Sequence, residues 1–170
     1  MTSLNRNESL LAELIGFPTV SALSNLSMIG TLADHLDQAG ARVEVFEDPG
    51  GTKANLWATI GPEGDGGLVL SGHTDVVPVE GQDWTRPPFD LTEDGDTLYG
   101  RGTCDMKGFI AACVAMAPAW AEAPLTRPLH FCFTHDEEVG CLGARALLPQ
   151  LSQRGIAPAM AIVGEPPEMR

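Results

Sequence analysis

Residues 108–134 read GFIAACVAMAPAWAEAPLTRPLHFCFT, and this stretch decides the fold class. Residues 108–120 are apolar almost throughout, which is typical of a buried helix, and Pro118 is expected to break this helix late. Residues 129–134 are rich in aromatic and other apolar side chains and predict a buried strand. A helix followed at once by a buried strand indicates a fold in which helices cover a sheet.

The same alternation continues toward the C-terminus. Residues 142–153 predict another helix, which must bend or weaken at Pro149, and residues 160–163 predict a last strand. Strands that alternate with helices favour an α/β fold. We therefore expect a mixed, largely parallel sheet flanked by helices, with an antiparallel part near the start of the chain.

The N-terminal half predicts two amphipathic helices and then a series of short strands. The helices are indicated by apolar residues at helical spacing, and glycine-rich turns separate the strands. The predicted elements are a helix around residues 10–15, a helix around residues 28–36 that ends near Gly40, strands at 42–46, 55–60 and 68–70, and a hairpin around residues 94–96.

Composition excludes several classes of protein. The chain has 170 residues and a formal net charge of −13, so one domain is expected and nucleic acid is an unsuitable partner. No apolar run approaches the roughly 20 residues that cross a bilayer, and the first residues lack the pattern of a secretory signal. We expect a cytoplasmic protein that does not bind membranes.

Acidic residues and one histidine follow the ends of the predicted strands. LVLSGHTD ends in His73 and Asp75, LHFCFTHDEE ends in residues 136–138, and AIVGEP contains Glu165. A further acid, Asp105, stands just before a predicted helix. Because ligands of open α/β sheets bind beyond the carboxyl ends of the strands, these groups are expected to converge. Their negative charges would repel one another unless a cation lay between them.

The donor types limit which cation is expected. Imidazole with carboxylates and no thiolate suits zinc, with cobalt or manganese as substitutes, and the number of carboxylates suggests two ions. The four cysteines show no zinc-finger spacing, and only Cys104, beside Asp105, lies near the expected site. Metal ions can activate a water for hydrolysis, with an adjacent glutamate as general base. Neighbours on a strand point to opposite faces, so Glu137 and Glu138 can share a site only if the strand has become a loop.

Each of these residues also has a simpler interpretation. His73 could be a capped turn residue, Asp75 could start a turn, and Asp105 could be only a helix N-cap. Residues 136–138 could form a solvated acidic loop, and Glu165 could lie in a surface turn. The occurrence of all of them at strand ends favours a shared site, because otherwise every simpler interpretation must hold at once.

Four motifs resemble one enzyme family. They are SGHTDVVPVEGQDW at residues 71–84, LYGRGTCDMKGF at 98–109, DEEVGCLGARAL at 136–147 and VGEP at 163–166. In this order they resemble the co-catalytic zinc metallopeptidase and amidohydrolase family, which includes acetylornithine deacetylases, succinyl-diaminopimelate desuccinylases and aminoacylases. The sequences of these motifs are most similar to those of the acetylornithine deacetylase branch.

The resemblance implies a role for each site residue. By resemblance, His73 and Glu165 would hold one zinc ion, Asp105 would bridge two ions, and Glu138 would hold the second. Glu137 would be the general acid and base, and Asp75 would fix the ring of His73. The family also implies a cis peptide bond after Asp105.

The resemblance covers only the N-terminal part of a longer architecture. Residues 1–170 would form the N-terminal part of the catalytic domain, without the smaller lid domain and without a later histidine ligand of the second zinc. The family further implies a small N-acyl amino acid as substrate, with N-acetylornithine favoured, and a homodimer for the complete enzyme. A succinylated or other acylated amino acid is the alternative substrate, and an inactive metal-binding fragment is the alternative of another class.

Overall fold

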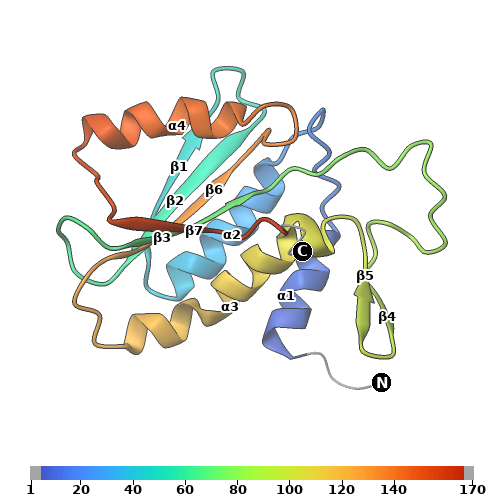
Figure 1. Ribbon diagram of the computed structural model, residues 1–170, viewed down its shortest axis with the longest axis horizontal. Helices are drawn as coiled ribbons and strands as arrows, with labels where there is room; N and C mark the ends of the chain where they lie inside the picture. Colours follow the sequence, from blue (N-terminus) through green and yellow to red (C-terminus); the bar gives the residue numbers. More distant parts are fainter. Residues whose placement is uncertain (1–4, 167–170) are drawn as a thin grey trace.

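A computed structural model describes residues 5–166 of the chain, which fold into a mixed sheet with helices on both faces (Figure 1). The five-stranded sheet has the order β1-β2-β6-β3-β7 within these residues. The pairs β1-β2 and β2-β6 are antiparallel, and the pairs β6-β3 and β3-β7 are parallel. The expected mixed α/β sheet with an early antiparallel part is confirmed, although parallel pairs make up half of the pairings rather than most of them.

The elements lie close to where the sequence places them. The helices are α1 (Arg6–Ile15), α2 (Leu26–Gln38), α3 (Gly108–Glu122) and α4 (Leu142–Gln153). The strands are β1 (Arg42–Glu47), β2 (Ala54–Ile60), β3 (Leu68–His73), β4 (Thr92–Asp94), β5 (Thr97–Tyr99), β6 (Leu129–Thr134) and β7 (Met160–Val163). Strands β4 and β5 form the predicted hairpin, which projects away from the main sheet (Figure 1).

Two apolar cores hold the helices against the sheet. Helices α1, α2 and α3 cover one face and α4 covers the other (Figure 1). Because successive side chains of a strand point to opposite faces, Phe131 and Phe133 enter the larger core, whereas Cys132 joins Leu147 and Leu151 of α4 in the smaller core. The central strands β2 and β6 are buried along their whole length, which agrees with their largely apolar sequences.

The break predicted at Pro118 is wrong, whereas the bend or weakening predicted at Pro149 stays a prediction. Helix α3 continues through Pro118 to Glu122, and α4 runs through Pro149 to Gln153. A proline removes one helical hydrogen bond, but the buried neighbours Val114 and Ala117 keep the last turns of α3 packed against the core. Packing therefore outweighs the local preference of the proline.

The edge strand β7 carries exposed apolar side chains. Met160, Ile162 and Val163 are 64%, 47% and 57% exposed, respectively.

In the described part of the chain, no helix is both long and apolar enough to cross a membrane. Cys113 and Cys132 are buried and Cys104 and Cys141 are exposed, and all four are free thiols.

Candidate metal centre

The candidate site lies where the parallel part of the sheet ends. Strand β3 ends in His73, and Asp75 follows it. Asp105 lies in the turn Thr103–Lys107 that precedes α3, while Glu137 and Glu138 follow β6 and Glu165 follows β7. Because β3 lies between β6 and β7 and is parallel to both, all three strands deliver their following residues to one edge.

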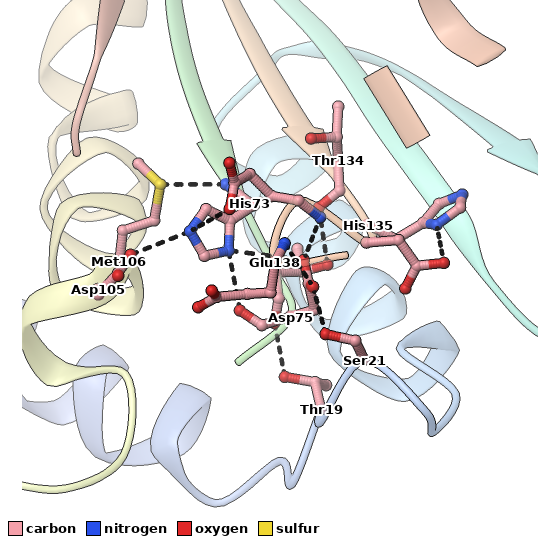
Figure 2. Close-up of polar contacts among 12 residues, drawn as sticks. Thr19, Ser21, His73, Asp75, Asp105, Met106, Thr134, His135 and Glu138 are labelled. Carbon is pink, nitrogen blue, oxygen red and sulfur yellow. Dashed lines mark hydrogen bonds and ion pairs between the residues drawn. The ribbon is translucent and has the colours of Figure 1, made fainter. Parts of the chain in front are cut away.

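His73 is the centre of this arrangement (Figure 2). Its side chain is only 2% exposed, and its Nδ1 lies 2.9 Å from the carbonyl oxygen of Asp75. On the other side of the ring, Nε2 lies 3.0 Å from Asp105 Oδ1, 3.5 Å from Glu165 Oε1 and 3.9 Å from Glu137 Oε2. The backbone carbonyl of Asp75 therefore orients the ring so that Nε2 faces three carboxylates.

Asp75 is a buried acceptor that joins three segments. Its carboxylate accepts hydrogen bonds from Ser21 Oγ at 2.7 Å, from the Glu137 amide at 3.0 Å and from the Glu138 amide at 3.3 Å. Its Oδ1 also lies 3.5 Å from His73 Nδ1. The simple turn interpretation of Asp75 does not describe this role, because the carboxylate links β3, the loop after β6 and the connection between α1 and α2.

The backbone after β6 explains how two adjacent glutamates reach one site. Strand β6 ends at Thr134, and Asp136 has a φ of 56°, in the left-handed region. This turn ends the strand alternation, and the amides of Glu137 and Glu138 both donate to Asp75. The condition derived from the sequence, that the strand has become a loop, is met.

Asp105 is held by a turn that is tied to the core. The Asp105–Met106 peptide bond is cis, as the resemblance implied. Met106 is fully buried, and its sulfur accepts a hydrogen bond from the amide of His73 at 3.2 Å. The ammonium group of Lys107 is buried and donates to the carbonyl oxygens of Leu14 and Phe17, at 2.9 and 2.6 Å. These contacts fix the backbone that follows Asp105. Its Oδ1 lies 3.0 Å from Nε2 of His73, so Asp105 is more than a helix cap.

Glu165 reaches the site because the backbone before it approaches α3 closely. A Cβ atom on Gly164 would lie 2.0 Å from Cγ of Phe109, so any other residue here would force Phe109 or the backbone to shift. The amide of Gly164 donates to the carbonyl oxygen of Ser71 at 3.2 Å, which extends the pairing of β7 with β3. Glu165, whose side chain is 42% exposed, then lies at the open side of the site.

The charges of the site are strongly coupled. Burial lowers the pKa of His73, but the hydrogen bonds and charge of Asp75, together with Glu165, outweigh burial and raise the pKa to about 9. Burial raises the pKa of Asp75, but His73, Ser21 and the Glu137 amide outweigh it and lower the pKa to about 2. The pKa values of Glu138 and Glu165 are raised, first by burial and then by neighbouring carboxylates that include Asp105.

The donor set fits divalent cations. Ligand atoms of His73, Glu137 and Glu165 lie within 4.8 Å of one another, and so do those of His73, Asp105 and Glu138. The clustered carboxylates repel one another unless a positive charge lies between them. Without a metal ion, the protonated ring of His73 supplies this charge. Imidazole and carboxylate oxygens without thiolate are donors that suit zinc and similar ions.

Several residues that build the site were not found by the sequence analysis. Ser21 contacts Asp75, and Thr19 Oγ1 donates to the Thr74 carbonyl oxygen at 2.6 Å. Asn25 donates to the Ala54 carbonyl oxygen at 2.8 Å and to Thr74 Oγ1 at 2.9 Å. All three lie in the connection between α1 and α2, about 50 residues before the strand end that they support. No local pattern signals such a contact.

Comparisons with known proteins identify the family of this chain. The sequence profile of peptidase family M20/M25/M40 matches residues 69–170. Acetylornithine deacetylases from Pasteurella multocida and from Photorhabdus laumondii are each 42% identical over 164 residues, covering 92% of this chain. The chain spans 42% of the length of these relatives.

Solved structures show the same fold. An M20 family metallo-carboxypeptidase from Sulfolobus solfataricus matches with a TM-score of 0.82 at 20% identity, covering 95% of this chain and 37% of that one. Human carnosine dipeptidase 1 matches with a TM-score of 0.76 at 26% identity, covering 87% of this chain and 35% of that one. The profile covers more than half of the chain and includes every proposed ligand, so this chain belongs to peptidase family M20/M25/M40.

Proposed function

We propose that residues 1–170 form the N-terminal part of the catalytic domain of a metal-dependent amidohydrolase. The observation that carries this proposal is the position of His73 Nε2, which lies within 3.9 Å of carboxylate oxygens from three separate segments. A simple turn or helix cap needs no such convergence. Similarity to acetylornithine deacetylases over 92% of the chain supports the same reaction class.

We assign the metal ligands by combining this geometry with the family motifs. His73 and Glu165 would hold one zinc ion, Asp105 would bridge two ions, and Glu138 would bind the second. Cobalt or manganese would be acceptable substitutes for zinc. Asp75 would act through His73. Its backbone carbonyl oxygen accepts a hydrogen bond from Nδ1 of His73, which leaves Nε2 of His73 available as a ligand atom.

Glu137 is the proposed general acid and base. Its carboxylate lies 3.9 Å from His73 Nε2 and its side chain is 38% exposed, while Asp75 holds its backbone amide beside the site. A bound divalent ion would supply Lewis acidity, polarising the amide carbonyl and making a water acidic enough to attack it near neutral pH. Glu137 would accept a proton from that water and pass it to the departing amine.

The proposed substrate is N-acetyl-L-ornithine, whose hydrolysis releases acetate in arginine biosynthesis in the cytoplasm. The identity of 42% to acetylornithine deacetylases supports this choice over a succinylated or other acylated amino acid. The net charge of −13 does not decide between these substrates. We further propose that the whole protein uses a lid domain for substrate binding and forms a homodimer.

Zinc titration of the 170-residue chain tests the metal centre, and acetate release by the complete gene product tests the reaction. We expect zinc binding that is lost in His73→Ala. Glu137→Gln should keep zinc binding nearly intact while acetate release falls by several orders of magnitude, because the proton acceptor is gone.

The two measurements separate the alternatives. Zinc binding without turnover in the complete gene product would favour an inactive metal-binding module. Turnover with N-succinylated amino acids in place of N-acetylornithine would replace the substrate and keep the centre. Unchanged turnover in Glu137→Gln would overturn the assignment of the general base.

A further inference from the structure

Lys53 is not a proposed metal ligand, but it contacts two segments that support the site, the α1–α2 connection and the loop after β6. It precedes β2, and its side chain is only 15% exposed. Its Nζ donates a hydrogen bond to the backbone carbonyl oxygen of Ser21 and another to Oδ1 of Asp136. One ammonium group thus joins the α1–α2 connection to the loop after β6.

Asp136 is the residue that turns this loop. It adopts a left-handed conformation with φ 56°, which is uncommon for a residue that has a Cβ atom. Its carboxylate is 11% exposed, with Oδ1 on Lys53 and Oδ2 3.1 Å from Nδ1 of His135. The contact with Lys53 therefore compensates a nearly buried charge at the point where the chain reverses.

The two partners of Lys53 meet again at Asp75. Ser21, whose carbonyl oxygen accepts from Lys53, donates its hydroxyl to Asp75. The residues that follow Asp136 donate their amides to the same carboxylate, at 3.0 Å for Glu137 and 3.3 Å for Glu138. Lys53 thus closes a ring of contacts around Asp75 without touching it.

We propose that Lys53 is a positioning residue, which holds Asp136 in its left-handed turn so that Glu137 and Glu138 both face the metal site. Neither Lys53 nor Asp136 belongs to the described groups of ligand atoms, so both act through other residues. The effect on metal binding rests on the proposed function. The effect on the loop does not, because the contacts that define it are within the protein.

Hydrogen exchange and zinc affinity of the 170-residue chain test this role in Lys53→Met. Amide exchange of Glu137 and Glu138 should become about tenfold faster than exchange of the β2 and β6 amides, which report global opening. Zinc affinity should fall about tenfold, as expected when a group that orients ligands is lost. Arg154→Met is the matched control, because it removes an ion pair with Glu44 in which both side chains are about half exposed.

A double-mutant cycle tests whether Lys53 acts through Asp136. Asp136→Asn should reproduce the exchange effect of Lys53→Met, and the double variant should show no larger effect than either single variant. Fully additive effects would overturn the proposal. So would uniform loss of protection across the whole chain, or values in Lys53→Met equal to those of Arg154→Met. If the unmodified chain binds no zinc, the proposed function fails, while the exchange measurement still decides the role of Lys53.

Discussion

The pair of His73 and Asp75 makes the stability of the metal-free chain depend on pH, and Asp75→Asn should weaken that dependence. Both side chains are buried, at 2% and 3% exposure, with Nδ1 and Oδ1 3.5 Å apart. Burial alone would lower the pKa of His73, but the contacts with Asp75 outweigh it and raise the pKa from 6.5 to about 9. Folding therefore favours the protonated ring.

The sign and size of the effect follow from this shift. Between about pH 6.5 and 9 the folded chain keeps a proton that the unfolded chain releases, so stability falls as the pH rises through this window. The contribution is fully present below about pH 6.5 and is lost above about pH 9. The rise from 6.5 to about 9 corresponds to about 3 kcal/mol of unfolding free energy.

Urea unfolding followed by circular dichroism, with a chelator present, measures this contribution. Unfolding free energies of the unmodified chain and of Asp75→Asn should be compared at about pH 6 and about pH 9.5. Burial lowers the pKa of Lys107 to about 7, which changes stability in the opposite direction over this range. Both proteins contain Lys107, so its titration cancels from the difference between them.

The advantage of the unmodified chain over Asp75→Asn should shrink between the two pH values by a large part of about 3 kcal/mol, because Asn removes the charge but keeps the backbone carbonyl that contacts Nδ1 of His73. A difference that stays constant with pH would refute the inference that Asp75 holds the proton on His73. A constant offset is expected in addition, because the variant also weakens the contacts with Ser21 and the two glutamate amides.

Two further predictions concern the metal site. Zinc must displace the proton of His73, so zinc affinity should rise by up to about tenfold per pH unit below about pH 9. Titration calorimetry in buffers of different ionisation enthalpy should show the release of this proton. An affinity that does not depend on pH would contradict a role for His73. Gly164→Ala would place a Cβ atom 2.0 Å from Cγ of Phe109, so Glu165 should move and zinc affinity should fall about tenfold. In the control variant Gly30→Ala the new Cβ meets nothing within 4 Å, so zinc affinity should stay unchanged. Equal affinities in these two variants would contradict the inference that the close approach at Gly164 positions Glu165 as a ligand.

The sequence predicted the elements of this fold well because its patterns are local. The apolar spacing of Leu10, Leu14 and Ile15 sets the buried side of α1, and the continuous apolar run of β6 sets a central strand. The break expected at Pro118 is wrong because it rests on the local preference of proline alone. The packing of α3 against the core, which keeps the helix intact, is not visible in the sequence.

The candidate site was predictable only as far as strand ends reveal it. His73, Asp105, Glu138 and Glu165 follow or precede regular elements, so topology alone brings them to one edge. Lys53 and Asn25 support that edge through hydrogen bonds to residues far along the chain, and such contacts depend on the folded geometry of three connections at once. The sequence required a loop before Glu137 and Glu138, but the left-handed turn at Asp136 had no signal of its own, because aspartate is common in many kinds of turn.

The most direct test of the metal centre is anomalous X-ray scattering at the zinc absorption edge, measured on crystals of the zinc-loaded chain. We expect a zinc peak bonded to Nε2 of His73 at about 2.0–2.1 Å, with carboxylate oxygens of Asp105 and Glu165 completing the contacts. A zinc peak that leaves His73 unbound, or zinc found only at other surface carboxylates, would contradict it.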